Sequence, residues 1–176
     1  MTRANFVKAA RKDYPDHGIK KGDSYYWWKF RYGGKWMSKT RPRPSQLTQS
    51  EFLGAVYGAQ ENVEDAVKDF NKDSDFDALA SALEDAAATI REQGESCLEK
   101  KDNMPEGLQE GDTGQLLDER ADQCESLADE LEQAASDVRE QEPDGTESTS
   151  DEDAAAKIES AREEAVGLAE GVSWDF

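Results

Sequence analysis

Apolar residues recur at three- and four-residue steps along most of the chain after residue 50. This spacing places the apolar side chains on one stripe of an α-helix. It predicts one helix beginning at the capping-box sequence Thr48-Gln49-Ser50-Glu51, a second opening at Ser74-Asp75, a third over about 115–140 and a fourth over about 153–170. Residues 102–114 are expected to be a loop. The stripes are narrow, step near 3.5 residues and are rich in Ala, which favours helical hairpins or coiled coils.

The first 50 residues follow a different pattern. The segment SYYWWKFRYGGKWMSKT has two aromatic, strand-like runs on either side of Gly33-Gly34, which predicts a β-hairpin with a two-residue turn. In that register Arg31 faces Trp36 and Phe30 faces Met37. Residues 2–13 are expected to form a short helix, and the hairpin needs cover from a helix or a third strand. Alternation then predicts a buried face of Tyr26, Trp28, Phe30, Tyr32 and Met37 and a mixed face of Tyr25, Trp27, Lys29, Arg31 and Trp36.

Together these patterns predict an α+β, mostly helical fold. A basic, aromatic β-hairpin head with a Pro/Arg arm covers residues 1–47, and an elongated, acidic helical hairpin or coiled-coil body of three helices covers 48–141. A linker is expected at 142–152, and a C-terminal helix with an aromatic tail at 153–176. The apolar content of 36% is below the ~45–50% of a typical globular chain, so a thin core is expected. Pairing of two copies, as a possible homodimer, would bury more apolar surface.

Charge divides the chain at the same place. Residues 1–50 hold 12 Lys/Arg and 3 Asp/Glu, and residues 51–176 hold 9 Lys/Arg and 37 Asp/Glu. The head should be attracted to polyanions and the body repelled by them. Adaptation to high salt would also produce excess carboxylates, but a basic head argues against it as the complete explanation.

The mixed face and the arm are the candidate nucleic-acid site, because rings can stack on bases while cations meet phosphates. The alternatives are a solvated face with Arg31 over Trp36, or burial of both faces. The arm KTRPRPSQLT, kept extended by its prolines, either follows a phosphate backbone or is a stiff linker. The expected contacts are Trp27, Lys29, Arg31, Trp36, Lys39, Arg41 and Arg43.

The chain offers little for catalysis. A single histidine, His17, weighs against His-based metal sites and Ser-His-Asp chemistry, so neither an enzyme nor a cofactor is expected. No apolar run approaches the ~20 residues of a membrane span, and the N-terminus lacks a signal segment, so a cytoplasmic location is expected, in a host cell if the protein is viral. Cys97 and Cys124 should lie at similar heights on facing helices. A disulfide is geometrically possible there, but two buried thiols are expected in the cytosol.

The acidic body supports a rival function. Its carboxylates could imitate the phosphates of a duplex and occupy a host protein, could fold back on the head and compete with nucleic acid, or could simply be a solvated face. The carboxylates considered for such partner binding are Asp118, Glu119, Asp122, Glu125 and Asp129.

Two stretches also carry a resemblance. GDSYYWWKFRYGGKWMSKTRPRPSQLTQSEF and DNMPEGLQEGDTGQLLDERADQCESLADELE resemble small uncharacterised accessory proteins of tailed phages, prophages and archaeal viruses. The run YYWWKFRYGGKWMSKT is similar to the arm-binding β-domain of tyrosine integrases, where an aromatic and basic sheet face meets DNA. The resemblance implies DNA handling or the blunting of host defence, and it transfers no functional residues. The leading expectation is a non-catalytic viral or prophage-type accessory protein that binds nucleic acid through its head. The alternative is an inhibitor of a host defence protein or an assembly scaffold that acts through the body.

Overall fold

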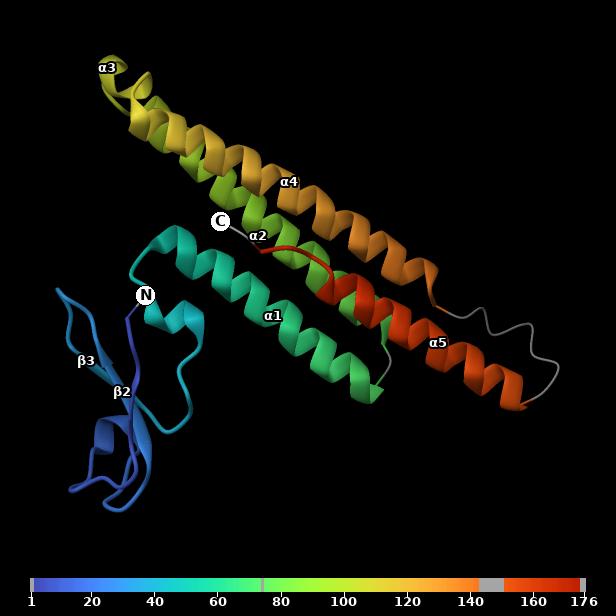
Figure 1. Cartoon of the computed structure of the whole chain (residues 1–176), viewed down its shortest axis with the longest axis horizontal. Helices are drawn as coiled ribbons and strands as arrows, with labels where there is room; N and C mark the ends of the chain where they lie inside the picture. The colour runs from blue at the N-terminus through green and yellow to red at the C-terminus, as the bar shows by residue number, and fades with distance from the viewer. Residues whose placement is uncertain (1, 74, 143–150, 175–176) are drawn as a thin grey trace. The chain divides into compact units, whose positions relative to one another are not determined.

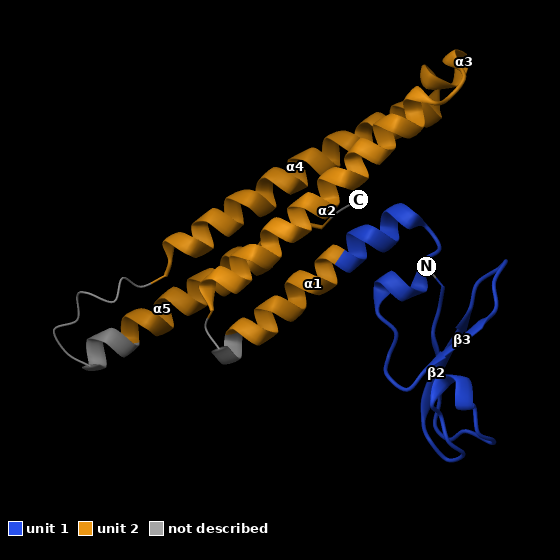
Figure 2. Cartoon of the chain, turned by 180° about the vertical axis from the view of Figure 1, so that it is seen from behind, with its two compact units in different colours: residues 1–58 blue, residues 59–176 orange. Residues whose placement is uncertain are grey.

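The computed structural model describes residues 2–73, 75–142 and 151–174 (Figure 1). The chain divides into two compact units, residues 1–58 and 59–176, which are described separately (Figure 2). A small antiparallel sheet lies at the N-terminus and long helices follow it, which confirms the predicted α+β, mostly helical fold.

Unit 1 is built on three short strands in the order β1-β2-β3. They are β1 (Asn5–Val7), β2 (Tyr25–Lys29) and β3 (Lys35–Ser38). The helix predicted over 2–13 is wrong, because Asn5–Val7 pairs with β2, with Phe6 opposite Tyr26. Phe and Val are favoured on a half-buried pleated surface, and pairing with an aromatic strand outweighs the helical pattern of the segment.

The register of the β2–β3 hairpin differs from the prediction. Trp28 lies opposite Trp36 and Lys29 opposite Lys35, so residues 30–34 form the connection. A two-residue turn of the favoured type needs positive φ angles at one or both central residues, and neither Gly33 nor Gly34 has one. The pairing is shifted by three residues, and an odd shift moves every β3 side chain to the other face.

The two faces therefore exchange Trp36 and Met37. Met37 lies on the inner face with Trp27, and both pack against the buried cluster of Ala10, Ile19 and Tyr25. Trp36 lies on the outer face, the one that carries Trp28. The predicted grouping of Trp27 with Trp36, and of Trp28 with Met37, is thus wrong.

The arm returns to the start of the sheet. The amide of Thr2 donates a 2.8 Å hydrogen bond to the carbonyl of Leu47, the last residue of a 3-10 helix, η2 (Pro44–Leu47). The arm is thus not extended throughout, since proline is tolerated at the first position of a helix. Helix α1 (Glu51–Asp73) starts where the capping-box sequence predicts, and the hydroxyl of Ser50 accepts a hydrogen bond from the amide of Leu53 at 3.3 Å.

Unit 2 contains the rest of α1 and four further helices: α2 (Phe76–Asp102), α3 (Glu106–Gln109), α4 (Asp112–Glu140) and α5 (Asp151–Glu170). Helices α2 and α4 pack side by side as an antiparallel hairpin (Figure 1). The predicted stripes of both are buried, and their core includes Leu79, Leu83, Ile90, Cys97, Leu117, Cys124, Leu131 and Val138. The helices approach closely at Gly94, where an added Cβ would lie 3.0 Å from the Cβ of Cys124.

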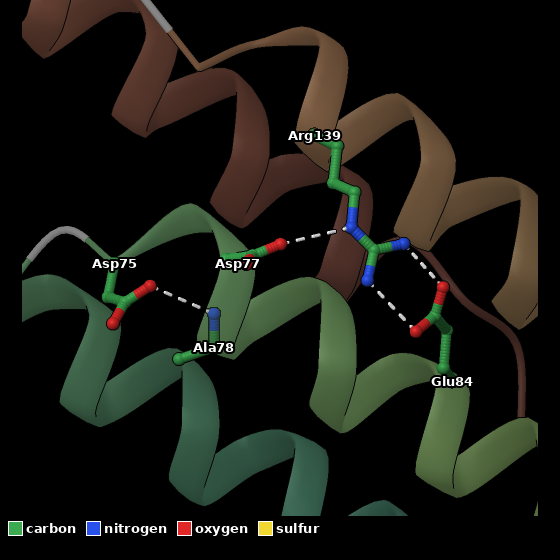
Figure 3. A network of polar contacts seen from close by, with 5 residues as sticks. All are labelled: Asp75, Asp77, Ala78, Glu84 and Arg139. Atoms are coloured by element: carbon green, nitrogen blue, oxygen red, sulfur yellow. Dashed lines mark hydrogen bonds and ion pairs between the residues drawn. The ribbon is translucent and has the colours of Figure 1, made fainter.

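Arginine side chains of each helix bridge the hairpin. The guanidinium of Arg139 donates to both carboxylate oxygens of Glu84 and, at 3.2 Å, to Asp77 (Figure 3). Near this end the Asp75 side chain caps α2 by accepting from the amide of Ala78 at 2.9 Å. The ion pairs of Arg139 are exposed, so each is expected to add little to stability.

The turn between α2 and α4 is more ordered than predicted. The expected loop over 102–114 contains α3, and α4 already starts at Asp112. The side-chain amide of Gln109 donates hydrogen bonds to the carbonyls of Met104 (2.9 Å) and Asp102 (3.3 Å). It thereby provides a donor for carbonyl groups at and just after the C-terminal end of α2.

Helix α5 packs on α4, and its buried residues Ala165 and Ala169 lie in its last turns; Val172, two residues after the end of α5, is also buried. Ile158, expected on the inward stripe, is exposed, whereas Ala165 and Ala169 farther along the helix are buried. Trp174 is half-buried and lines a groove with Val63 and Val67 of α1. Most of the predicted linker at 142–152 lies outside the described residues, as does Phe176 of the aromatic tail.

Candidate nucleic-acid interface

The seven residues predicted to contact nucleic acid do not share one face. Trp27 is half-buried against the inner-face cluster, whereas Trp36 is 55% exposed on the outer face. Lys29 and Arg31 are exposed at the end of the hairpin. Lys29 and Arg31 therefore lie at the same end of the hairpin as Trp36, but Lys29 is on the inner face with Trp27, whose ring lies under Lys35.

The three cations of the arm differ in their contacts. Lys39 forms a 2.8 Å ion pair with Asp23, whose pKa is lowered mainly by the hydrogen bond from Lys39 and further by the amide of Lys20. The side chain of Arg41 is exposed. The backbone amide of Arg43 donates to the side-chain oxygen of Gln46 at 3.1 Å, at the start of η2.

The end of the β2–β3 hairpin gathers cations and rings. Lys29 and Lys35 are directly opposite each other, and the ammonium of Lys35 lies 4.6 Å from the centroid of the Trp27 ring. In the connection, the guanidinium of Arg31 lies 5.4 Å from the centroid of Tyr32, which is 85% exposed. The expected contact of Arg31 with Trp36 is thus replaced by two other cation–π contacts. We call Lys29, Arg31, Tyr32, Lys35 and Trp36 the hairpin end.

Two members of the hairpin end, Tyr32 and Lys35, were not among the predicted contacts. Both stand in the same aromatic and basic run as the others. The assumed two-residue turn placed Lys35 opposite Tyr32 at the turn itself, and only the observed register places it opposite Lys29.

The outer face of the sheet carries a row of aromatic rings. Phe6 on β1 is 59% exposed and its ring centroid lies 5.0 Å from that of half-buried Tyr26 on β2. Trp28 is buried next to exposed Trp36 in the register. The Nε1 atom of Trp28 has no hydrogen-bond acceptor among the described residues.

Positive charge at the hairpin end is not balanced locally. Residues 24–50 contain six Lys/Arg and no Asp or Glu. Within the described parts of the chain, Lys29, Arg31 and Lys35 form no ion pair. A positive field therefore surrounds exposed rings at this end of unit 1.

The acidic residues of α4 expected to bind a partner are partly neutralised. Asp118 pairs with Lys101 at 2.6 Å, and Glu125 and Asp129 lie 3.7 and 3.2 Å from the guanidinium of Arg91. The other two, Glu119 and Asp122, are exposed. Arg91 also pairs with Glu132 at 2.6 Å and holds the pKa of that carboxyl below its usual value.

Two further features bear on the kind of protein. None of the helices in the described ranges is both long enough and apolar enough to cross a bilayer. Among these same residues, no three His, Cys, Asp or Glu side chains are grouped as a metal site requires. Comparison of the chain with known protein families, with curated proteins and with solved structures finds no match.

Proposed function

We propose that this protein is a non-catalytic accessory protein of the viral or prophage type that binds nucleic acid through unit 1. The observation that supports the proposal is the hairpin end, where Lys29, Arg31 and Lys35 lack carboxylate partners in the described structure beside the exposed rings of Tyr32 and Trp36. Phosphates would supply the missing negative charge and bases would cover the rings.

Two lysines lie opposite each other on neighbouring strands at the hairpin end. Like charges directly opposite each other on neighbouring strands destabilise a sheet. Lys29 and Lys35 stand in that relation, and Arg31 adds a third charge in the connection. A bound polyanion turns this repulsion into attraction, so the arrangement is unfavourable in the free protein and favourable in a complex.

The test is binding of the full chain to fluorescently labelled oligonucleotides, measured by anisotropy at several salt concentrations. Each neutralised phosphate contributes about −0.7 to −0.9 to the slope of log K against log salt. The triple variant Lys29→Gln/Arg31→Gln/Lys35→Gln should therefore lower the magnitude of the slope by about 2 to 3. The control is Lys68→Gln/Lys100→Gln/Lys157→Gln, which removes the same charge from exposed positions of unit 2.

The outcome that contradicts the proposal is a chain that binds no oligonucleotide at low salt, or a head triple variant that binds with the wild-type slope. The rival, inhibition of a host protein or scaffolding through the acidic helices, is weakened because three of its five carboxylates are paired with Lys101 or Arg91. It would be favoured if a host protein stayed bound after nuclease treatment and was released by Glu119→Gln/Asp122→Gln.

A further inference from the structure

We infer that the nucleic acid recognised by unit 1 is single-stranded, an inference that rests on the proposed function and names its substrate class. Three rings of unit 1 are more than half exposed: Phe6 on β1, Tyr32 in the hairpin connection and Trp36 on β3. Exposed aromatic rings next to cations are the elements of single-strand binding, because unpaired bases can stack on them. In a duplex the bases are already stacked on one another, so such rings have no base face to cover.

The spacing of the rings suits separate bases. Phe6 and Trp36 lie on the same face of the sheet, on the two outer strands, and their partners on β2 are two residues apart. With strands ~4.8 Å apart and a rise of ~3.4 Å per residue, their backbones are about 12 Å apart. One base cannot cover both rings. The half-buried ring of Tyr26 lies between them, beside Phe6.

Charge completes the surface. Arg31 lies against the ring of Tyr32, and Lys29 and Lys35 stand at the same end of the hairpin as Trp36 but on the opposite face of the sheet. No carboxylate occurs in residues 24–50 to repel a phosphate backbone. A single strand that passes around the end of the hairpin, with bases on Trp36 and Tyr32, would bring its phosphates to Arg31 and to Lys29 and Lys35 on the other face of that end. Cations next to exposed rings favour a single-stranded polyanion over a protein partner. The carboxylates of an acidic protein would match the cations but would leave the rings without bases to stack on them.

The experiment compares the full chain with a labelled single strand and with the duplex of the same sequence and length at one low salt concentration. We expect the single strand to bind at least tenfold more tightly and to quench tryptophan fluorescence. Because base–ring stacking is worth ~1–3 kcal/mol per base, Trp36→Ala and Phe6→Ala should each weaken single-strand binding by about 5- to 150-fold. Trp36→Phe should keep most of the wild-type affinity for the single strand. Neither Trp36→Ala nor Phe6→Ala should change duplex binding by more than about twofold.

A control and a further variant keep the result interpretable. The control Leu98→Ala removes an exposed apolar side chain from unit 2 and should leave binding unchanged. The further test variant Tyr32→Ala alters a connection residue that is not part of a strand, so it should weaken binding without a risk to folding. Equal or tighter duplex binding that is lost in the lysine–arginine triple variant would overturn the single-strand inference and leave the proposed function standing. Absence of binding to both forms would overturn the proposed function itself.

Discussion

Gly114 offers the sharpest test of the turn that joins α2 to α4. It is the third residue of α4, and an added Cβ would overlap the carbonyl oxygen of Gln109 and lie 2.6 Å from its carbonyl carbon and 2.9 Å from its Cα. All three atoms belong to the backbone, so no side-chain rotation relieves the overlap. Gly114→Ala therefore forces the α3–α4 connection to move.

The cost has two parts. Overpacking of this kind typically costs ~1–3 kcal/mol. Displacing Gln109 also weakens the two hydrogen bonds that its side chain donates to the carbonyls of Met104 and Asp102 at the end of α2. Their loss should cost about 1 kcal/mol in total. We expect a loss of roughly 2–4 kcal/mol in the free energy of unfolding, or a fall in Tm of about 4–16 °C for a chain of this size.

The assay is thermal and urea unfolding followed by circular dichroism at a helical band. Gly107→Ala is the matched control, because Gly107 lies in α3 with no atom within 4 Å of an added Cβ. It should be neutral or stabilising by up to ~1 kcal/mol, since Ala is the better helix former. The reasoning is refuted if the two variants differ by less than about 0.5 kcal/mol.

Further measurements test the packing and the charges of unit 2. Leu131 is fully buried, so Leu131→Ala should lower the free energy of unfolding by ~2–5 kcal/mol in urea titrations. Leu98 is 46% exposed, so Leu98→Ala should change the free energy of unfolding by less than about 0.5 kcal/mol. Equal effects of the two substitutions would contradict the burial of Leu131. The hydrogen bond from Arg139 lowers the pKa of Glu84 in the folded state, so the pair stabilises the protein above pH 4.5 and ceases to do so as the pH falls through the lowered folded pKa. The difference in Tm between the wild type and Arg139→Gln should therefore shrink as the pH falls through that window. A Tm difference that does not depend on pH would contradict this role of the pair. Burial, with a contribution from Cys97, raises the pKa of Cys124 to about 11, so a thiol reagent at pH 8 should label Cys124 only after unfolding, and rapid labelling of the native chain would show that the thiol is accessible.

The helical part could be predicted from the sequence because its signals are local. The stripe positions of α2 and α4 are set by a spacing of three and four residues, and the caps at Ser50 and Asp75 stand directly before their helices. Similar heights for Cys97 and Cys124 were expected from the position of the turn alone, and both are buried thiols as expected. Ile158 fits the same periodicity but is exposed, because periodicity does not show how closely a helix approaches its neighbours.

The sheet could be predicted only in part because its pairing is not local. The Gly33-Gly34 pair permits several connection lengths, and a shift of three residues sufficed to separate Trp27 from Trp36. Strand β1 has three residues, too few to show alternation, so its pairing with β2 has no sequence signal of its own. The charge of the candidate site was evident from composition, but which rings accompany that charge depends on the register.

The helical hairpin also has a consequence for how the chain folds. Its ion pairs join residues progressively farther apart in sequence: 17 residues for Lys101–Asp118, 41 for Arg91–Glu132 and 55 for Arg139–Glu84. The entropy of closing a loop rises with its length, and local contacts speed folding. We expect the hairpin to form first at α3 and then to close outward, each contact shortening the loop that the next must close. During synthesis, this process needs little more of the chain than residue 118 before it can begin.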